Sequence, residues 1–169
     1  MKFILASQSP YRKAQLESAG LTFLAEAPRV NEDDLKGRGP KEPQALAEFL
    51  ARQKATSLKM AFPKDFILGG DQLVEFAGSV LGKPGGRERA ILQLLRMQGA
   101  THRLITSIFL ISPSGEKAFT DITEITLRKL SREEAEAYVD RDQPYDCAGS
   151  YKIEKAGMCL IERIVSEIG

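Results

Sequence analysis

The sequence is poor in residues on which several classes of site and fold depend. Its 169 residues include two cysteines and one histidine. Two cysteines can form neither a disulfide framework nor a four-thiolate zinc site, so we expect reduced thiols in a cytoplasmic protein. The single imidazole, on His102, rules out sites built from several histidines. Ser-His-Asp or Cys-His catalysis would depend on that one candidate.

The chain also lacks a charge excess and long apolar runs. Lys and Arg total 24 and Asp and Glu total 23, which gives a net charge of +1. Proteins that bind duplex DNA normally carry a basic excess. The longest apolar stretch, residues 104–111, is too short to span a bilayer, and the polar segment 7–13 cuts short a signal-like start. We therefore expect a cytoplasmic protein with no nucleic-acid and no membrane partner.

Hydrophobic residues make up 43% of the chain, which is enough for a sizeable core. Short apolar runs with the length of strands alternate with segments of helical spacing, and two hairpins are inserted. The expected elements are strands at 2–6, 22–25, 66–68 and 158–165, hairpins at 73–82 and 102–127, helices at 10–19, 46–58, 86–98 and 131–141, and a loop at 31–43. The first hairpin is expected to turn near Ala77 and Gly78, and a capping box at 131–134, with Ser131 and Glu134 at its ends, is expected to open the last helix. This order predicts an α/β fold with a mixed twisted sheet and flanking helices, in a single domain over residues 1–169.

The first candidate site is the segment 7–13, which joins an expected strand to an expected helix. Ser9 is the expected N-cap and Pro10 the first helical residue. Free backbone N–H groups, the helix dipole and the cations Arg12 and Lys13 together predict an anion site, most naturally for phosphate. The alternative is an ordinary capped helix with solvated basic residues.

The second candidate is Asp71, which follows Gly69 and Gly70 at the expected end of the strand 66–68. Active sites of open α/β sheets lie at the carboxyl ends of strands. The two glycines would let a ligand approach the backbone closely. Asp71 would then hold a metal or activate water, whereas the alternative is a plain turn aspartate.

Three further charged positions are candidates. Lys83 stands in the Gly/Pro-rich loop 82–86, where it would contact phosphate. The acidic run 32–34, which includes Glu32, would supply a metal ligand or form a solvated face. Lys54 lies on the mostly apolar side of its helix, an unusual place for a charge unless the side chain snorkels.

These segments together resemble the Maf family of nucleoside triphosphate pyrophosphatases, from residue 2 to about residue 165. The resemblance is carried, in matching order and spacing, by FILASQSPYRKAQLESAG, PRVNED, AEFLARQKA, FILGGDQLVEFAGSVLGKP and DCAGSYKIEKAG. It implies an elongated, two-lobed architecture like that of ITPase-type enzymes, with a central cleft. It also implies hydrolysis between the α- and β-phosphates, a divalent metal (Mg²⁺ or Mn²⁺), a nucleotide substrate and homodimer formation.

The resemblance assigns roles position by position. Asp71 matches the proton acceptor that activates the attacking water, and Glu32 matches the metal-associated acid that acts with Asp71. The positions that match the polar and cationic groups around the triphosphate are Ser7, Arg12, Lys54 and Lys83. Phosphoanhydride cleavage needs charge neutralisation and an oriented water, which this set and a metal would supply.

Three positions concern the substrate. Tyr11, Gln72 and Glu154 resemble the branch that hydrolyses 7-methyl-GTP, whereas many enzymes for dTTP and UTP have Arg, Thr and Gln there. Methylation at N7 makes the guanine ring cationic, so that it stacks on an aromatic face, and a carboxylate can accept from its N1–H and amino groups. We expect 7-methyl-GTP. The alternatives are dTTP, UTP or another NTP and, in another class, a nucleotide-binding regulator of cell division without turnover.

The family usually continues past the last strand with a Gly-Leu-Pro turn and a closing helix, whereas this sequence stops at Gly169. The matched site residues all lie upstream, so we expect the chemistry to be unaffected. We also expect the lobe formed by residues 1–30 and 155–169 to expose an apolar face.

Overall fold

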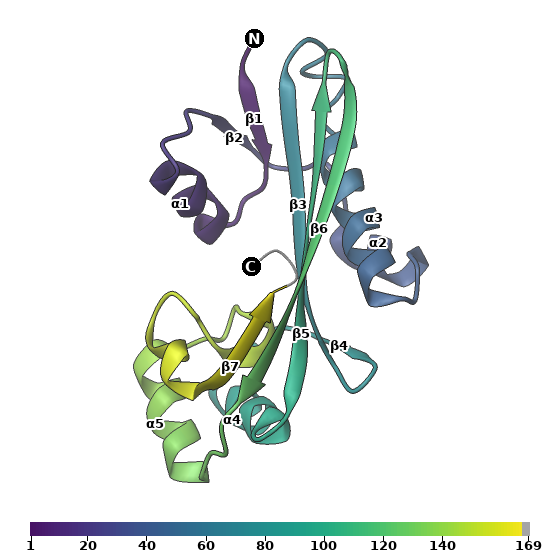
Figure 1. The fold of residues 1–169 in the computed structure, drawn as a ribbon. Coiled ribbons are helices and arrows are strands. Elements are labelled where there is room, and N and C mark those ends of the chain that lie inside the picture. The colour runs from purple at the N-terminus through teal and green to yellow at the C-terminus, as the bar shows by residue number, and fades with distance from the viewer. Residues whose placement is uncertain (167–169) are drawn as a thin grey trace. The chain divides into compact units, whose positions relative to one another are not determined.

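The computed structural model describes residues 1–166 and contains one mixed sheet with helices (Figure 1). In chain order its elements are β1 (Phe3–Ala6), α1 (Pro10–Ser18), β2 (Leu24–Glu26), α2 (Glu32–Arg38), α3 (Pro43–Thr56), β3 (Phe66–Phe76), β4 (Ser79–Leu81), α4 (Arg87–Met97), β5 (Thr101–Ser112), β6 (Gly115–Leu127), α5 (Arg132–Asp142), the short 3₁₀ helices η1 (Ala148–Ser150) and η2 (Ala156–Leu160), and β7 (Ile161–Ser166).

The strand order is β2-β1-β3-β5-β6-β7, and β4 pairs with β3. β1 runs parallel to both β2 and β3, whereas β3 and β4, and β6 and β7, are antiparallel. Parallel and antiparallel pairs in one sheet, together with five α-helices among the described residues, confirm the predicted α/β class.

Contacts divide the chain into two compact units. Unit 1 consists of Met1–Gln72 and Thr106–Thr120; unit 2 consists of Leu73–Ile105 and the chain from Asp121 onward. Each unit has its own hydrophobic core. A single domain over residues 1–169 and a central cleft between two lobes stay predictions.

The core of unit 1 lies between α3 and the strands β1, β3 and β5. Its buried residues are Ile4, Ala6, Ala51, Ala55, Leu58, Ile67, Phe109 and Ile111. Helix α3 approaches β3 so closely that a Cβ on Gly69 would lie 2.2 Å from the carbonyl oxygen of Ala51. Gly69 is therefore required for helix packing, and its predicted role in admitting a ligand is wrong.

The core of unit 2 gathers around α4 and α5. Its fully buried side chains include Ala90, Ile91, Leu94, Met97, Ile125, Leu127, Ala135 and Val139. Helix α5 begins with the predicted capping box, in which Ser131 and Glu134 satisfy each other's backbone N–H groups. It ends at Gln143, which has left-handed backbone angles.

Two local predictions are wrong. The segment 31–43 is not all loop, because Asn31 caps α2 by accepting hydrogen bonds from the backbone N–H groups of Asp33 and Asp34. The strand that begins at Phe66 does not end at Gly69 but continues to Phe76. Asp71 therefore lies inside a strand rather than at its carboxyl end.

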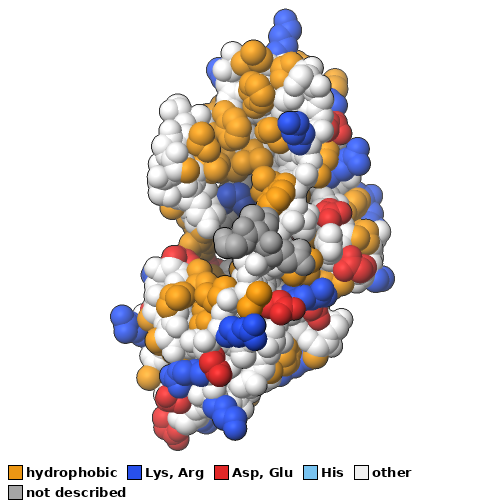
Figure 2. Space-filling model, viewed as in Figure 1, with side chains coloured by type: hydrophobic (Ala, Val, Ile, Leu, Met, Phe, Trp, Pro, Cys, Tyr) orange, Lys and Arg blue, Asp and Glu red, His pale blue; other side chains and the backbone are white. Residues whose placement is uncertain are grey.

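Both units expose apolar side chains. In unit 1, α1 has no fully buried residue, and Leu21 and Leu24 are exposed. Figure 2 shows hydrophobic side chains, in orange, at the surface of the face that it draws. In unit 2, Met158, Ile164 and Val165 are exposed. The segments 1–30 and 155–166 thus show the predicted apolar exposure but belong to different units, and residues 167–169 lie outside the described part. Within residues 1–166, no helix has both the length and the apolar character needed to cross a membrane.

Candidate active site

A buried ion pair between Lys54 and Asp71 forms the centre of the candidate site in unit 1. Lys54 projects from α3 and Asp71 from β3, and their Nζ and Oδ1 atoms are 2.6 Å apart. Lys54 is 7% exposed and Asp71 5% exposed. Lys54 therefore does not snorkel to solvent. Burying two charges carries a desolvation penalty, which their mutual attraction offsets only in part.

Glu32 extends this pair to a cluster of three charged groups. It is the first residue of α2, and its Oε2 lies 2.9 Å from the Nζ of Lys54. Its Oε1 lies 2.8 Å from the Nζ of Lys36, one helical turn further on. Burial raises the pKa of Glu32, but hydrogen bonds and ion pairs with Lys36 and Lys54 outweigh it and lower the pKa to about 2. Glu32 is therefore an anion at neutral pH.

Asp71 uses only one of its two carboxylate oxygens within the described chain. Oδ1 accepts from Lys54, whereas Oδ2 is buried and has no hydrogen-bond partner among residues 1–166. Burial raises the pKa of Asp71, and the attraction of Lys54 and Arg12 does not fully offset this. A buried polar atom without a partner costs free energy and calls for an explanation. Here it leaves a carboxylate oxygen able to bind a proton, a water or a cation.

Ser7 and Arg12 lie where β1 leads into α1. The hydroxyl of Ser7 accepts from Nη1 of Arg12 at 3.0 Å and from the backbone N–H of Ser9 at 3.1 Å. Ser9 caps α1 as predicted. A Cβ on Gly70 would lie 3.2 Å from Nε of Arg12, so the guanidinium packs over this glycine. Burial lowers the pKa of Arg12, while Asp71 and Glu32 oppose the shift.

The structure therefore brings together five residues that the sequence singled out in separate segments. They are Ser7, Arg12, Glu32, Lys54 and Asp71. Arg12 and Lys54 supply positive groups that can contact an anion, and Glu32 and Asp71 supply carboxylates that can accept a proton or a cation.

Two of the predicted specificity residues also belong to unit 1. Tyr11 precedes Arg12 on α1 and is half-buried. Gln72 follows Asp71, is exposed, and donates from Nε2 to Oγ1 of Thr106 at 3.0 Å. The contribution of Thr106 was missed, because no local pattern reveals the partner of a residue 34 positions away. Lys36 was missed for a different reason: its spacing to Glu32 is informative only on a helix, and a loop was predicted there.

The remaining predicted residues, Lys83 and Glu154, belong to unit 2. Both are exposed. Lys83 lines a pocket of about 340 Å³ together with Gly82, Pro84, Arg89, Leu92, Gln93 and Arg96. Their assignment to the same site as the unit 1 residues stays a prediction.

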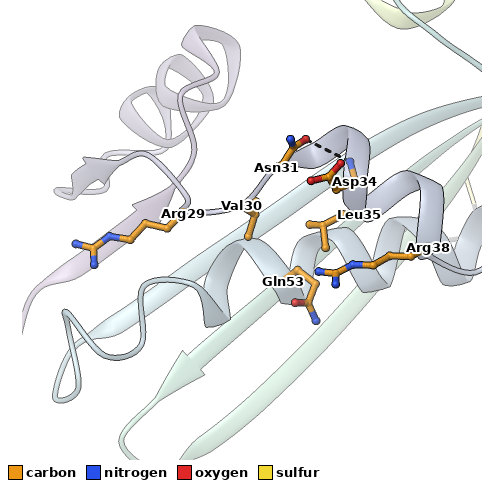
Figure 3. A pocket seen from close by; sticks show the side chains of 7 residues that line it. All are labelled: Arg29, Val30, Asn31, Asp34, Leu35, Arg38 and Gln53. Carbon is orange, nitrogen blue, oxygen red and sulfur yellow. Dashed lines mark hydrogen bonds between the residues drawn. The ribbon is translucent and has the colours of Figure 1, made fainter.

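Unit 1 also has a pocket of about 400 Å³ that contains none of the predicted site residues. It is lined by Arg29, Val30, Asn31, Asp34, Leu35, Arg38 and Gln53. Figure 3 shows the guanidinium of Arg38 turned toward Gln53 and that of Arg29 turned away from the other side chains. These two cations do not converge, so the pocket offers no focused anion site.

Two carboxylates of the cluster are of the kind that a hard divalent cation binds. Within residues 1–166 no group of three or more His, Cys, Asp or Glu side chains could hold a metal. Two carboxylates, those of Glu32 and Asp71, nevertheless reach the same Lys54 nitrogen, and Oδ2 of Asp71 is unpartnered among the described residues. Mg²⁺ is commonly held by one or two carboxylates, with water and substrate phosphates completing its shell.

Comparisons with known proteins identify the family. The model of the family described as "Maf-like protein" matches residues 2–168. The 7-methyl-GTP pyrophosphatase of Bdellovibrio bacteriovorus is 48% identical over 167 residues and that of Xanthomonas axonopodis pv. citri 41% over 166, each alignment covering 98% of this chain and 86% of the relative. The structure of the Staphylococcus aureus Ham1 protein matches with a TM-score of 0.51 at 16% identity, over 93% of this chain and 90% of that one, which supports the fold alone. With this family match and these relatives, the chain belongs to the Maf family.

Proposed function

We propose that this protein is a metal-dependent nucleoside triphosphate pyrophosphatase that hydrolyses 7-methyl-GTP to 7-methyl-GMP and pyrophosphate. Membership of the Maf family and the name shared by the two relatives support the proposal. The observation that carries it is the buried Asp71, with one oxygen on Lys54 and the other without a partner among the described residues.

In the proposed reaction, Oδ2 of Asp71 accepts a proton from a water molecule. The water oxygen forms a bond to the α-phosphorus, the bond from that phosphorus to the α,β-bridging oxygen breaks, and pyrophosphate leaves with that oxygen. A raised pKa makes Asp71 a better base than an ordinary aspartate. Lys54 keeps Asp71 ionised and oriented through its contact with Oδ1.

The other residues neutralise and orient the triphosphate. Ser7 holds the guanidinium of Arg12 beside the start of α1, where backbone N–H groups also favour anions. Lys83, which belongs to unit 2, is also assigned to neutralising the triphosphate. Glu32 and Asp71 would hold Mg²⁺ or Mn²⁺, which when bound neutralises phosphate charge. Charge neutralisation is the main requirement of phosphoryl transfer, so these contacts account for most of the expected rate enhancement.

Substrate choice is assigned to Tyr11, Gln72 and Glu154. The cationic ring of 7-methylguanine would stack on Tyr11, and Glu154 would accept hydrogen bonds from its N1–H and amino groups. The hydrogen bond to Thr106 restricts the side-chain amide of Gln72, so that this amide would present one orientation to a bound nucleobase.

The decisive experiment is pyrophosphate release with Mg²⁺ across the common NTPs and dNTPs and 7-methyl-GTP. Selective turnover of 7-methyl-GTP is expected. The double variant Tyr11→Arg with Gln72→Thr should move the preference toward UTP and dTTP. If the unaltered protein prefers a pyrimidine nucleotide, the pyrophosphatase activity stands and the assignment of 7-methyl-GTP as substrate is overturned. Nucleotide binding without any turnover would favour a regulator of cell division.

The proposal includes a cytoplasmic location and a homodimer. The exposed Leu21 and Leu24 in unit 1 are the kind of apolar surface that a second copy would cover. Light scattering on the purified protein tests the dimer, for which a monomeric mass at micromolar concentration is the contrary result.

A further inference from the structure

The side chain of Gln93 joins two segments of unit 2, the loop 82–86 and the loop 149–155, which begins in the last turn of η1. Gln93 lies on α4, where its Nε2 donates to the carbonyl oxygen of Gly82 at 3.0 Å. Its Oε1 accepts from the hydroxyl of Ser150. An uncharged side chain with a donor and an acceptor at the same end is needed to make both contacts, which only the amides of Gln and Asn provide with fixed geometry.

Each of the two loops carries a residue assigned to substrate binding. Lys83 follows Gly82 directly, and Glu154 lies four residues after Ser150. Both side chains are exposed, so their positions depend on the backbone that carries them. A second bond, from the backbone N–H of Gly85 to the carbonyl oxygen of Tyr145 at 2.9 Å, ties the loop 82–86 to the segment that leads into η1.

The loop at Ser150 needs such support. Ser150 is fully buried and has a φ of +61°, directly after Gly149 with a φ of +78°. Two successive residues in the left-handed region are unfavourable when the second has a side chain. Tertiary contacts must therefore hold this turn, and the hydrogen bond from Ser150 to Gln93 is one of them.

We propose that Gln93 is a positioning residue that sets Lys83 and Glu154 relative to each other and so controls substrate affinity. This inference rests on the proposed function, because it assigns Gln93 a role in binding the same nucleotide. Gln93 acts through the two loops. Its loss should raise KM for 7-methyl-GTP more than it lowers kcat, since the reacting groups are assigned to unit 1.

The test compares Gln93→Met with Gln98→Met. Methionine matches the length of glutamine and makes neither hydrogen bond. Gln98 also belongs to unit 2, at the C-cap of α4, and its Oε1 accepts from the backbone N–H of Leu130 at 3.3 Å, away from both loops. Gln93→Met should raise KM about tenfold with kcat little changed, and Gln98→Met should leave both unchanged. An unchanged KM in folded Gln93→Met protein overturns the inference.

Two smaller changes separate the contacts if Gln93→Met folds poorly. Ser150→Ala removes only the hydroxyl contact, and Gln93→Glu keeps an acceptor for Ser150 but cannot donate to Gly82. Ser150→Ala should raise KM by less than Gln93→Met. Gln93→Glu should raise it at least as much as Gln93→Met, because a carboxylate oxygen would face the carbonyl oxygen of Gly82. Equal KM values for both variants and the unaltered protein overturn the inference.

Hydrogen exchange measures the coupling without relying on activity. In Gln93→Met, the backbone N–H groups of 82–86 (Pro84 has none) and of 149–155 should exchange faster together, whereas Gln98→Met should leave both segments protected. Absence of turnover in the unaltered protein would defeat the proposed function while this exchange result still reports the coupling. Unchanged exchange in Gln93→Met, with normal turnover, overturns the inference alone.

Discussion

The two units bury charged side chains in different ways. In unit 1, the buried Lys54 and Asp71 pair with each other, and Lys54 also contacts the carboxylate of Glu32. One oxygen of Asp71 has no partner among the described residues. Here the buried charges face other side chains, and one of them keeps an unused acceptor.

In unit 2, the buried charges bind the backbone in addition to side chains. Glu75 also pairs with Arg103 at 2.7 Å, and Lys152 pairs with Asp146 at 3.6 Å. Glu75 accepts from the backbone N–H of Gly78, Asp142 accepts from that of Ala156, and Lys152 donates to the carbonyl oxygen of Gln143. Such bonds fix turns and chain ends, and the groups have little capacity left for chemistry. Burial alone therefore does not mark a catalytic carboxylate. Asp142 accepts from a backbone N–H and faces Arg141, whereas Oδ2 of Asp71 has no partner among the described residues, and this unused oxygen distinguishes Asp71 from Asp142.

The largest expected effect that tests this contrast comes from Asp71→Asn. An amide cannot accept the proton of the attacking water at neutral pH, so turnover should fall by about 10³-fold or more. Binding of the nucleotide should persist. The measurement is kcat for pyrophosphate release, together with nucleotide affinity from calorimetry.

Asp142→Asn in unit 2 is the matched control. An asparagine oxygen can still accept from Ala156, so turnover should stay near that of the unaltered protein and the melting temperature should change little. Loss of turnover in both variants would remove the distinction between the two carboxylates.

The next effect is expected from Lys54→Met, which leaves Asp71 buried without its cation. Removing one partner of a buried ion pair typically costs about 3–5 kcal/mol of stability. The double variant with Asp71→Asn should recover much of that stability, because the uncompensated charge is gone, but not the turnover. Urea unfolding and activity assays on the two variants check this. Equal stability of the single and double variants would show that the pair is not desolvated.

In unit 2, we expect acid to lower the stability of the fold through the buried His102. The ring is 1% exposed, and its Nε2 shares a hydrogen bond of 2.8 Å with the hydroxyl of Tyr151. Burial lowers the pKa of His102 to about 4, from an ordinary value of 6.5. The folded state therefore favours the neutral ring. Below pH 6.5 the unfolded chain binds a proton at His102 that the folded protein does not bind. The free energy of unfolding consequently falls between pH 6.5 and pH 4, by about 3 kcal/mol in total.

The measurement for His102 is the free energy of unfolding at pH 7 and at pH 4. His102→Gln stays neutral and keeps a polar contact for Tyr151, so its stability should depend less on pH than that of the unaltered protein by about 3 kcal/mol. The difference between the two proteins removes the contribution of carboxylates such as Glu32. Parallel pH profiles would place the acid sensitivity outside unit 2's buried histidine.

The sequence predicted features whose signals are local. Ser9 before Pro10 identified the start of α1, and the pair Ser131 and Glu134 identified that of α5. The turn at Ala77 was also expected, and its φ of 51° confirms a tight turn. In each case the groups that fix the backbone are neighbours in the chain, so one sequence contains the full signal.

Features that depend on contacts between distant segments could not be predicted in the same way. Lys54 and Asp71 are 17 residues apart and meet only because α3 packs tightly onto β3 at Gly69. Resemblance to a family supplied their roles, but not their contact. Helix α2 was missed partly for the same reason. Its Leu35 is buried by tertiary packing, which a charged, glycine-containing segment does not reveal.

The smallest effect that would sharpen the contrast is expected from Ser7→Ala in unit 1. The hydroxyl of Ser7 accepts from a charged guanidinium, that of Arg12, at 3.0 Å. Its loss should leave Arg12 charged but less well oriented, and kcat/KM should fall about tenfold, equivalent to about 1.4 kcal/mol. Ser18→Ala is the control on the same helix: the Ser18 hydroxyl donates only to the exposed carbonyl of Gln15 within the described hydrogen bonds. Steady-state kinetics on both variants make the comparison. A tenfold loss in both would reflect damage to α1, whereas a loss in Ser7→Ala alone assigns the effect to the orientation of Arg12.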